Sequence, residues 1–382
     1  MSQMAHHRET REIPVLRPLL PTAERLLPYL SRIDASRCYT NWGPLASELE
    51  ARLAHRFGVA GHGVISASSG TTALVGAILA TAGRATTDRP FAILPAMTFV
   101  ATAIAVEQCG YHVHLVDVTS DQWLLDPSGL YEHPLLGRTG IVVPVSAYGR
   151  PLAHEPWQAF QQQTGIPVVI DGAASFEAIS GDPKRLLSEL PVVLSFHATK
   201  AFATGEGGCV ITTDARLAAS VTRSLNFGFY EDRESRSPST NGKMSEYHAA
   251  VGLAELDAWP EKHHAILGVA KSYKTLMHRA GLAGRLAAAP EVAACYVLYE
   301  SATEHEAGCV RRALNSLRVE HRSWYGAGVH GQPHFRNVSR DVLEVSNRIA
   351  SVLIGLPTAP DLAESDMSRV VSAIELGVGR SR

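Results

Sequence analysis

The chain has 382 residues, 46% of them hydrophobic, which is enough to bury one large core and a second, smaller one. Its net charge of −2, with acidic and basic residues interspersed, excludes the strong field that nucleic acid or an anionic membrane would require, so we expect a small-molecule substrate. Five cysteines without a Cys-x-x-Cys unit support neither a disulfide framework nor a thiolate metal site, and they indicate a reducing cytoplasm. The polar N-terminus and the lack of a long uncharged apolar run argue against secretion and membrane spanning.

The first element in chain order is a predicted helix that ends at Gly58. Glu48 precedes Arg52 by four residues, the spacing at which opposite charges pair along a helix. Large apolar residues recur every four positions and define one buried face: Leu45, Leu49, Leu53 and Phe57.

Short β-branched runs then alternate with helical stretches, a pattern typical of an α/β fold. Several runs are apolar at every position, which predicts a mainly parallel, seven-stranded sheet with helices on both faces. The seven runs are 63–67, 91–95, 112–118, 141–145, 167–171, 192–196 and 209–213.

Beyond residue 215 the strand rhythm fades. The polar segment 231–243 is expected to be a loop, and a long helical stretch follows that we expect to be interrupted near Trp259 and Pro260. We therefore expect a large domain over 1–257, including the N-terminal segment, and a small C-terminal α+β domain over 258–382.

Polar residues with chemical potential follow three of these strands, at the edge where ligands bind in open parallel sheets. After the first strand, small residues around Gly70 and Thr71 open a helix whose free N–H groups favour a phosphate. Judged alone, this pattern is more commonly an ordinary Ser/Thr helix cap.

Asp171 ends a wholly apolar strand and is followed by residues too small to shield it. A buried carboxylate requires a cationic partner, and a pyridinium nitrogen is one such partner. The alternative is a cap for the next helix.

Lys200 lies in a small-residue loop after the sixth strand. Apolar surroundings favour a neutral amine, which attacks aldehydes and carries protons. His197, three residues earlier, is expected to line the same site. No His-Glu-x-x-His unit is present among the seventeen histidines, so we expect no metal.

Together these segments resemble the sugar aminotransferases of the DegT/DnrJ/EryC1/StrS group, within the aspartate-aminotransferase fold type I. The resemblance covers nearly the whole chain and is strongest around Lys200. The matching segments are NWGP (41–44), SSGTTAL (68–74), PAMTFVATA (95–103), VIDGAAS (169–175), SFHATKAFATGEGG (195–208), NGKMSEYHAA (241–250) and WYGAGVHGQPHF (324–335).

The resemblance implies pyridoxal 5'-phosphate as the cofactor, with pyridoxamine 5'-phosphate as its aminated form. Lys200 would be the catalytic Schiff-base lysine, Asp171 would contact the pyridine nitrogen, and Phe99 would stack on the ring. Gly70, Thr71 and Ser195 would hold the phosphate, and Asn241 would reach it from the neighbouring subunit of a homodimer. One departure is Ala174, where many relatives have Gln, and it affects the contact near the 3-hydroxyl of the ring.

The resemblance further implies glutamate as the donor and a nucleotide-linked 4-keto-6-deoxyhexose, carried by dTDP, as the acceptor. The product would be a 4-amino-4,6-dideoxy sugar nucleotide of the kind used in lipopolysaccharide O-antigen. Arg322, Tyr325 and His330 could contact the diphosphate or the sugar, or could be packing residues. Amination at C3, a pyridoxal-phosphate lyase or desulfurase, and a non-catalytic regulator are the alternatives.

Overall fold

The computed structural model describes residues 11–381, so residues 1–10 of the polar N-terminal segment lie outside the described part. The strands are β1 (Val64–Ala67), β2 (Phe91–Pro95), β3 (His112–Val116), β4 (Thr139–Val142), β5 (Ile170–Asp171), β6 (Val192–Ser195), β7 (Gly208–Ile211), β8 (Leu286–Ala287), β9 (Leu298–Glu300), β10 (Ser339–Arg340) and β11 (Leu353–Gly355). The helices are α1 (Ala23–Ser36), α2 (Pro44–Phe57), α3 (Gly70–Thr81), α4 (Val100–Gln108), α5 (Glu155–Thr164), α6 (Phe176–Gly181), α7 (Pro183–Leu186), α8 (Ala215–Leu225), α9 (Glu246–Arg279), α10 (Glu304–Ser316), α11 (Glu344–Val352) and α12 (Glu364–Ser381).

The seven predicted strands are confirmed as β1 to β7, and they form one central sheet in which β10 is an additional eighth strand beside β3. Two four-stranded halves, ordered β1-β7-β6-β5 and β10-β3-β2-β4, meet through parallel bridges that join Val142 to Val168 and Val145 to Asp171. Pairing is parallel except at β7, which runs antiparallel to both of its neighbours. The sheet is therefore mainly parallel, as the apolar runs predicted.

Both faces of this sheet are buried. Along β6, Val192 and Leu194 belong to one core cluster, whereas Val193 belongs to the other. The first cluster includes residues of α2, α6 and α9, and the second includes residues of α3, α4 and α8. Covered faces explain why the strand sequences are apolar at successive positions instead of alternating.

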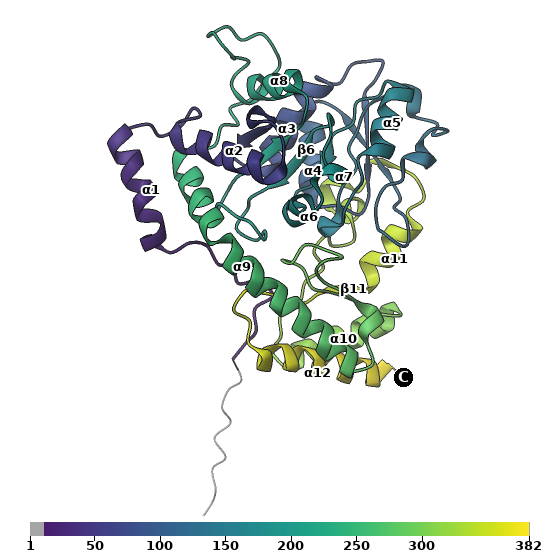
Figure 1. The fold of residues 1–382 in the computed structure, drawn as a ribbon. Coiled ribbons are helices and arrows are strands. Elements are labelled where there is room, and N and C mark those ends of the chain that lie inside the picture. The colour runs from purple at the N-terminus through teal and green to yellow at the C-terminus, as the bar shows by residue number, and fades with distance from the viewer. Residues whose placement is uncertain (1–10, 382) are drawn as a thin grey trace, which may run out of the picture.

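The predicted helix before Gly58 is confirmed as α2, and Gly58 ends it in a left-handed conformation with φ of 64°. The expected pairing of Glu48 with Arg52 was wrong. Glu48 accepts a hydrogen bond from Arg32 at 2.6 Å, and Arg52 donates to Asp257 at 2.7 Å. Helix α9 packs against both α1 and α2, so side chains of α1 and α9 reach the surface of α2 and provide these partners (Figure 1).

The expected interruption near Pro260 was also wrong, because α9 continues from Glu246 to Arg279 without a break. Proline removes one helical N–H, but packing compensates for that loss here. Trp259 is buried, with ring centroids 4.9 Å from Phe176 and 6.0 Å from Phe202. Burial of this face holds the helix together through the proline.

The C-terminal part contains a small antiparallel sheet with the order β11-β9-β8. Helices α10 and α12 pack together against the C-terminal half of α9, away from the central sheet (Figure 1). Because α9 spans the expected boundary at 257/258 and β10 pairs with β3, the division into two domains remains a proposal. Within residues 11–381, no helix is long and apolar enough to cross a membrane.

Two helices begin on carboxylates that lie far away in the sequence. Glu246 accepts hydrogen bonds from the backbone N–H groups of Leu45 at 2.8 Å and Ala46 at 2.9 Å, at the start of α2. Asp117 accepts from the backbone of Val345 and Ser346 at the start of α11, both at 2.8 Å. A negative charge at a helix N-terminus satisfies free N–H groups and complements the helix dipole.

Candidate active site

The carboxyl ends of β1, β5 and β6 lie at one edge of the sheet, as the sequence pattern predicted. Strand β1 leads into α3, β5 ends at Asp171, β6 ends at Ser195, and Lys200 follows in the next loop. Strands β5 and β6 are parallel, with Asp171 opposite Val193. The fold therefore gathers the three chemical signals of the sequence at a single edge.

The start of α3 lies against the end of β6 with no room for a side chain at Gly70. A Cβ atom at Gly70 would lie 2.8 Å from Cβ of Ser195, and one at Gly208 would lie 2.8 Å from the backbone nitrogen of Gly70. Ser69 caps the helix by accepting from the Thr72 N–H at 3.1 Å, so the simpler interpretation as a cap also holds. Thr71 lies half-buried in the first turn. The outcome is a close-packed helix N-terminus beside a serine hydroxyl, a geometry suited to a phosphate.

Asp171 is buried, with a relative exposure of 4%. It accepts hydrogen bonds from the Thr102 hydroxyl at 2.7 Å and from the Ala173 N–H at 3.0 Å. Burial raises the pKa of this carboxyl group, while the two hydrogen bonds and the charge of Lys200 oppose that rise. The helix-cap alternative does not hold, because the next helix, α6, begins at Phe176 with Ser175 as its N-cap residue.

Lys200 is half-buried and donates a hydrogen bond from Nζ to the Tyr296 hydroxyl at 3.2 Å. Burial raises the pKa of Tyr296 well above its ordinary value, so this phenol is neutral at physiological pH. Lys200 also lines a cavity whose walls include Cys295 and Ile266. The amine is thus oriented by a neutral acceptor and remains accessible.

A group of stacked tyrosines adjoins Lys200. The rings of Tyr148 and Tyr325 stack with centroids 4.4 Å apart, and Tyr296 packs edge-on to Tyr148 at 5.4 Å. The Tyr325 hydroxyl accepts from the Tyr148 N–H at 3.1 Å, and burial raises its pKa. Arg322 lines a small cavity with Tyr148 and Tyr325. Of the expected substrate residues, Tyr325 and Arg322 are therefore adjacent to one another.

The remaining expected site residues are exposed or half-buried. Phe99 precedes α4 and is 57% exposed, so it is not a core aromatic. His197 is exposed and its Nδ1 contacts the Thr199 hydroxyl at 2.8 Å. His330 is half-buried and its Nε2 contacts Oδ1 of Asn347 at 2.8 Å.

Asn241 lies at the end of the expected loop, between α8 and α9. Its side chain is exposed and accepts a hydrogen bond from Lys243 at 2.6 Å. The adjacent Gly242 carbonyl accepts from the Ser68 N–H at 2.7 Å, which fixes this segment beside the start of α3.

Two polar contacts of the site were absent from the sequence-based prediction. Thr102, whose hydroxyl donates to Asp171, lies three residues after Phe99. It belongs to the segment 95–103 that resembles the family, so the resemblance was a signal that could have identified it. Tyr296 lies ninety-six residues after Lys200 and carries no local signal, because tertiary packing alone brings it there. Ala174 is half-buried, and its carbonyl oxygen would lie 2.6 Å from a Cβ atom at Gly149, so this segment packs tightly without the larger side chain.

Solved structures with this architecture define the class of protein. A putative PLP-dependent aminotransferase from Bacillus cereus is 28% identical with a TM-score of 0.87, covering 95% of this chain and all (100%) of that one. The structure of DesI with its TDP-sugar product is 30% identical with a TM-score of 0.85, and the match covers 97% of this chain and 94% of that one. The fold, the buried Asp171 and the half-buried Lys200 agree with this class: the protein is a pyridoxal-phosphate-dependent aminotransferase.

The family model of the DegT/DnrJ/EryC1/StrS aminotransferases matches residues 22–375, and the chain belongs to that family of sugar aminotransferases. Protein Rv3402c of Mycobacterium tuberculosis is 31% identical over 95% of this chain and 90% of its own length. The dTDP-4-amino-4,6-dideoxy-D-glucose transaminase of Escherichia coli is 26% identical over 95% of this chain and 98% of its own length. A UDP-N-acetyl-3-dehydro-alpha-D-glucosamine 3-aminotransferase of Acidithiobacillus ferrooxidans is 28% identical over 93% of this chain and 94% of its own length.

Proposed function

We propose that the protein transfers the amino group of glutamate to a dTDP-linked 4-keto-6-deoxyhexose, giving a 4-amino-4,6-dideoxy sugar nucleotide. The observation that carries the chemistry is the placement of a buried carboxylate, Asp171, and the amine of Lys200 at the same sheet edge. The E. coli transaminase and DesI with its TDP-sugar product support the choice of acceptor.

The residues at this edge fit pyridoxal phosphate. Asp171 is a buried carboxylate whose two hydrogen-bond donors are both neutral. A protonated ring nitrogen would supply a positively charged partner for it. Gly70, Thr71 and Ser195 would hold the phosphate at the N-terminus of α3. Phe99 would cover one face of the ring, since its own side chain is open to solvent. The bound cofactor supplies an electron sink for charge that develops beside the amino nitrogen.

The chain itself would supply proton transfer and orientation. Lys200 would take up and deliver the proton at Nζ in both halves of the reaction. Tyr296 would keep this amine turned toward the site through their 3.2 Å hydrogen bond. Thr102 would keep Asp171 ionised, because its hydroxyl donates to the charged carboxylate.

Acceptor contacts would come from Arg322, Tyr325, His330 and His197. Arg322 offers a permanent positive charge next to Tyr325, which suits a diphosphate beside a sugar hydroxyl. Asn347 would orient His330, and Thr199 would orient the exposed His197.

The first test is the absorbance of the purified protein with pyridoxal phosphate, before and after glutamate, for the wild type and for Lys200→Ala. We expect a bound-cofactor band in the wild type that glutamate removes, and neither change in the variant. Release of ammonia or sulfide without a ketone acceptor would instead identify a lyase or desulfurase, and a band unaffected by glutamate would reject this donor.

Amination at C3 is the second candidate, because the A. ferrooxidans relative is a 3-aminotransferase. Incubation with dTDP-4-keto-6-deoxyglucose and with its 3-keto isomer, followed by NMR of the product, separates the two. The position of the new C–N bond decides between them.

We also propose a homodimer in which Asn241 completes the neighbouring site. Exposed aromatic side chains on the described surface, Phe99, Phe227 and Tyr230 among them, favour a covered interface. Co-expression of Lys200→Ala and Asn241→Ala chains tests the crossing. If Asn241 acts across the interface, the mixed dimer regains one intact site and measurable activity, although each variant alone is inactive. If Asn241 acts within its own chain, the mixture stays inactive.

The proposed compartment is the cytoplasm. All five cysteines are free thiols, which suits a reducing environment.

A further inference from the structure

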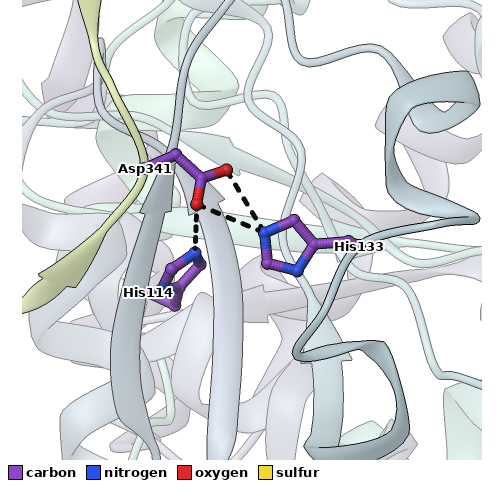
Figure 2. Close-up of side chains that lie close together, drawn as sticks. All are labelled: His114, His133 and Asp341. Carbon is purple, nitrogen blue, oxygen red and sulfur yellow. Dashed lines mark hydrogen bonds and ion pairs between the residues drawn. The ribbon is translucent and has the colours of Figure 1, made fainter.

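A cluster of three metal-binding residue types lies at the outer edge of the central sheet. His114 lies within β3, His133 follows in the connection toward β4, and Asp341 comes directly after β10. Figure 2 shows both imidazole rings turned toward the carboxylate of Asp341. Three segments that are distant in the sequence thus present their ligand atoms to a common point.

The separations suit a single ion. Nε2 of His114 lies 3.2 Å from Oδ1 of Asp341, and Nε2 of His133 lies 3.2 Å from Oδ2. One ligand atom from each residue lies within 4.8 Å of the others. Zinc binds imidazole nitrogen and carboxylate oxygen at about 2.1 Å, so its tetrahedral ligands are about 3.4 Å apart.

The surroundings prepare the two rings differently. Nδ1 of His114 contacts the Ser339 hydroxyl at 2.8 Å, an outer contact that fixes the ring and leaves Nε2 facing the centre. Nδ1 of His133 accepts from the Leu135 N–H at 3.2 Å, and this contact must yield when Nε2 binds an ion.

We propose that His114, His133 and Asp341 form a binding site for a divalent transition metal, with Zn²⁺ the best match to two imidazoles and one carboxylate. The side chains of both histidines are 7% exposed or less, whereas that of Asp341 is 41% exposed. Water can therefore complete the coordination from the Asp341 side.

The site joins β10 to β3, so its role is structural. Strand β10 has two residues and pairs with His114 and Leu115 of β3, so backbone pairing alone holds it weakly. An ion held by His114 of β3 and by Asp341 after β10 would fix the C-terminal segment to the sheet edge. This inference does not depend on the proposed reaction, since none of its residues belongs to the cofactor site.

The competing interpretation is a metal-free clasp in which both rings donate hydrogen bonds to Asp341. It explains the same distances but predicts no saturable binding of metal. The two interpretations also differ in how the variants respond to zinc, and this difference makes the test decisive.

The test uses untagged, metal-stripped, full-length protein loaded with pyridoxal phosphate. Zn²⁺ is titrated against a chromophoric chelator, and Co²⁺ is added separately to record its visible absorbance. We expect one Zn²⁺ per chain, a cobalt band, and a higher melting temperature with zinc. The variants His133→Gln and Asp341→Asn should bind at least about tenfold more weakly, and Ser339→Ala about tenfold more weakly.

His334→Gln is the matched control. His334 contacts Glu107 at 3.0 Å on the surface, a similar imidazole–carboxylate pair that is not part of the cluster. This variant should bind zinc like the wild type. Cofactor absorbance in each variant reports that the protein has folded. The proposal falls if the wild type shows no saturable zinc binding, or if His133→Gln and Asp341→Asn bind zinc as well as the wild type does.

Discussion

Replacement of Thr102 by Val tests how the ionised form of Asp171 is maintained. Val keeps the shape of the side chain but removes the hydroxyl that donates to Asp171 at 2.7 Å. A hydrogen bond to a charged group contributes about 1.5–3 kcal/mol, whereas one to a neutral group contributes about 0.5–1.5 kcal/mol. We therefore expect Thr102→Val to lower the free energy of unfolding of the cofactor-free protein by about 1.5–3 kcal/mol where Asp171 is ionised.

The pH dependence follows from the raised pKa of Asp171. Burial raises this pKa above its ordinary value of 3.8, so the contribution of Asp171 to stability is present at low pH and is lost as the pH rises through the folded-state pKa. Removal of the Thr102 hydroxyl raises the pKa further. The penalty of Thr102→Val should therefore be larger at pH 8 than near pH 4, as measured by urea denaturation at both values.

The same variant should bind pyridoxal phosphate about 10- to 100-fold more weakly in an absorbance titration, because a protonated ring nitrogen needs an ionised Asp171. Thr98→Val is the control. The Thr98 hydroxyl lies 2.9 Å from that of Thr102 but makes no contact with Asp171 among the described hydrogen bonds. An equal stability penalty at both pH values, or unchanged cofactor affinity, would refute the reasoning.

Three further predictions concern close contacts. Gly70→Ala places a Cβ atom 2.8 Å from Ser195 and should weaken cofactor binding about tenfold in the same titration, whereas unchanged binding would show that α3 shifts freely. Tyr296→Phe removes the acceptor of Lys200 and should lower kcat about tenfold at unchanged cofactor stoichiometry, so an unchanged kcat argues against orientation by this phenol. Glu246→Gln removes the negative charge from the start of α2 and should reduce the free energy of unfolding, measured by urea denaturation, by about 1 kcal/mol. Equal urea midpoints for the variant and the wild type would mean that the charge contributes nothing to the stability of α2.

Much of the fold could be predicted because local pattern and burial agree. The strands of the central sheet are apolar on both faces, so their sequences alone identify them. The errors arose where distant segments decide the outcome. The neighbours of Trp259 hold α9 together through Pro260, and Arg52 pairs with Asp257 of α9 rather than with Glu48 on its own helix.

The site was predictable to the extent that it follows strand ends. Asp171 ends β5 and Lys200 lies in the loop after β6, the adjacent parallel strand, so topology alone brings them to the same edge. Tyr296 and Tyr325 come from the C-terminal part of the chain, and only packing places them against Tyr148 and Lys200. The cluster of His114, His133 and Asp341 shows the same limit, since no spacing in the sequence relates its members.

The carboxylate at the start of α2 ties the order of an early helix to a segment that is synthesised much later. Helix α2 acquires its acceptor only when Glu246, some two hundred residues later, has been synthesised and has docked. An emerging N-terminal fragment would therefore hold α2 with frayed first turns. Consolidation of α2 therefore depends on the docking of α9, which favours a cooperative transition over stepwise growth.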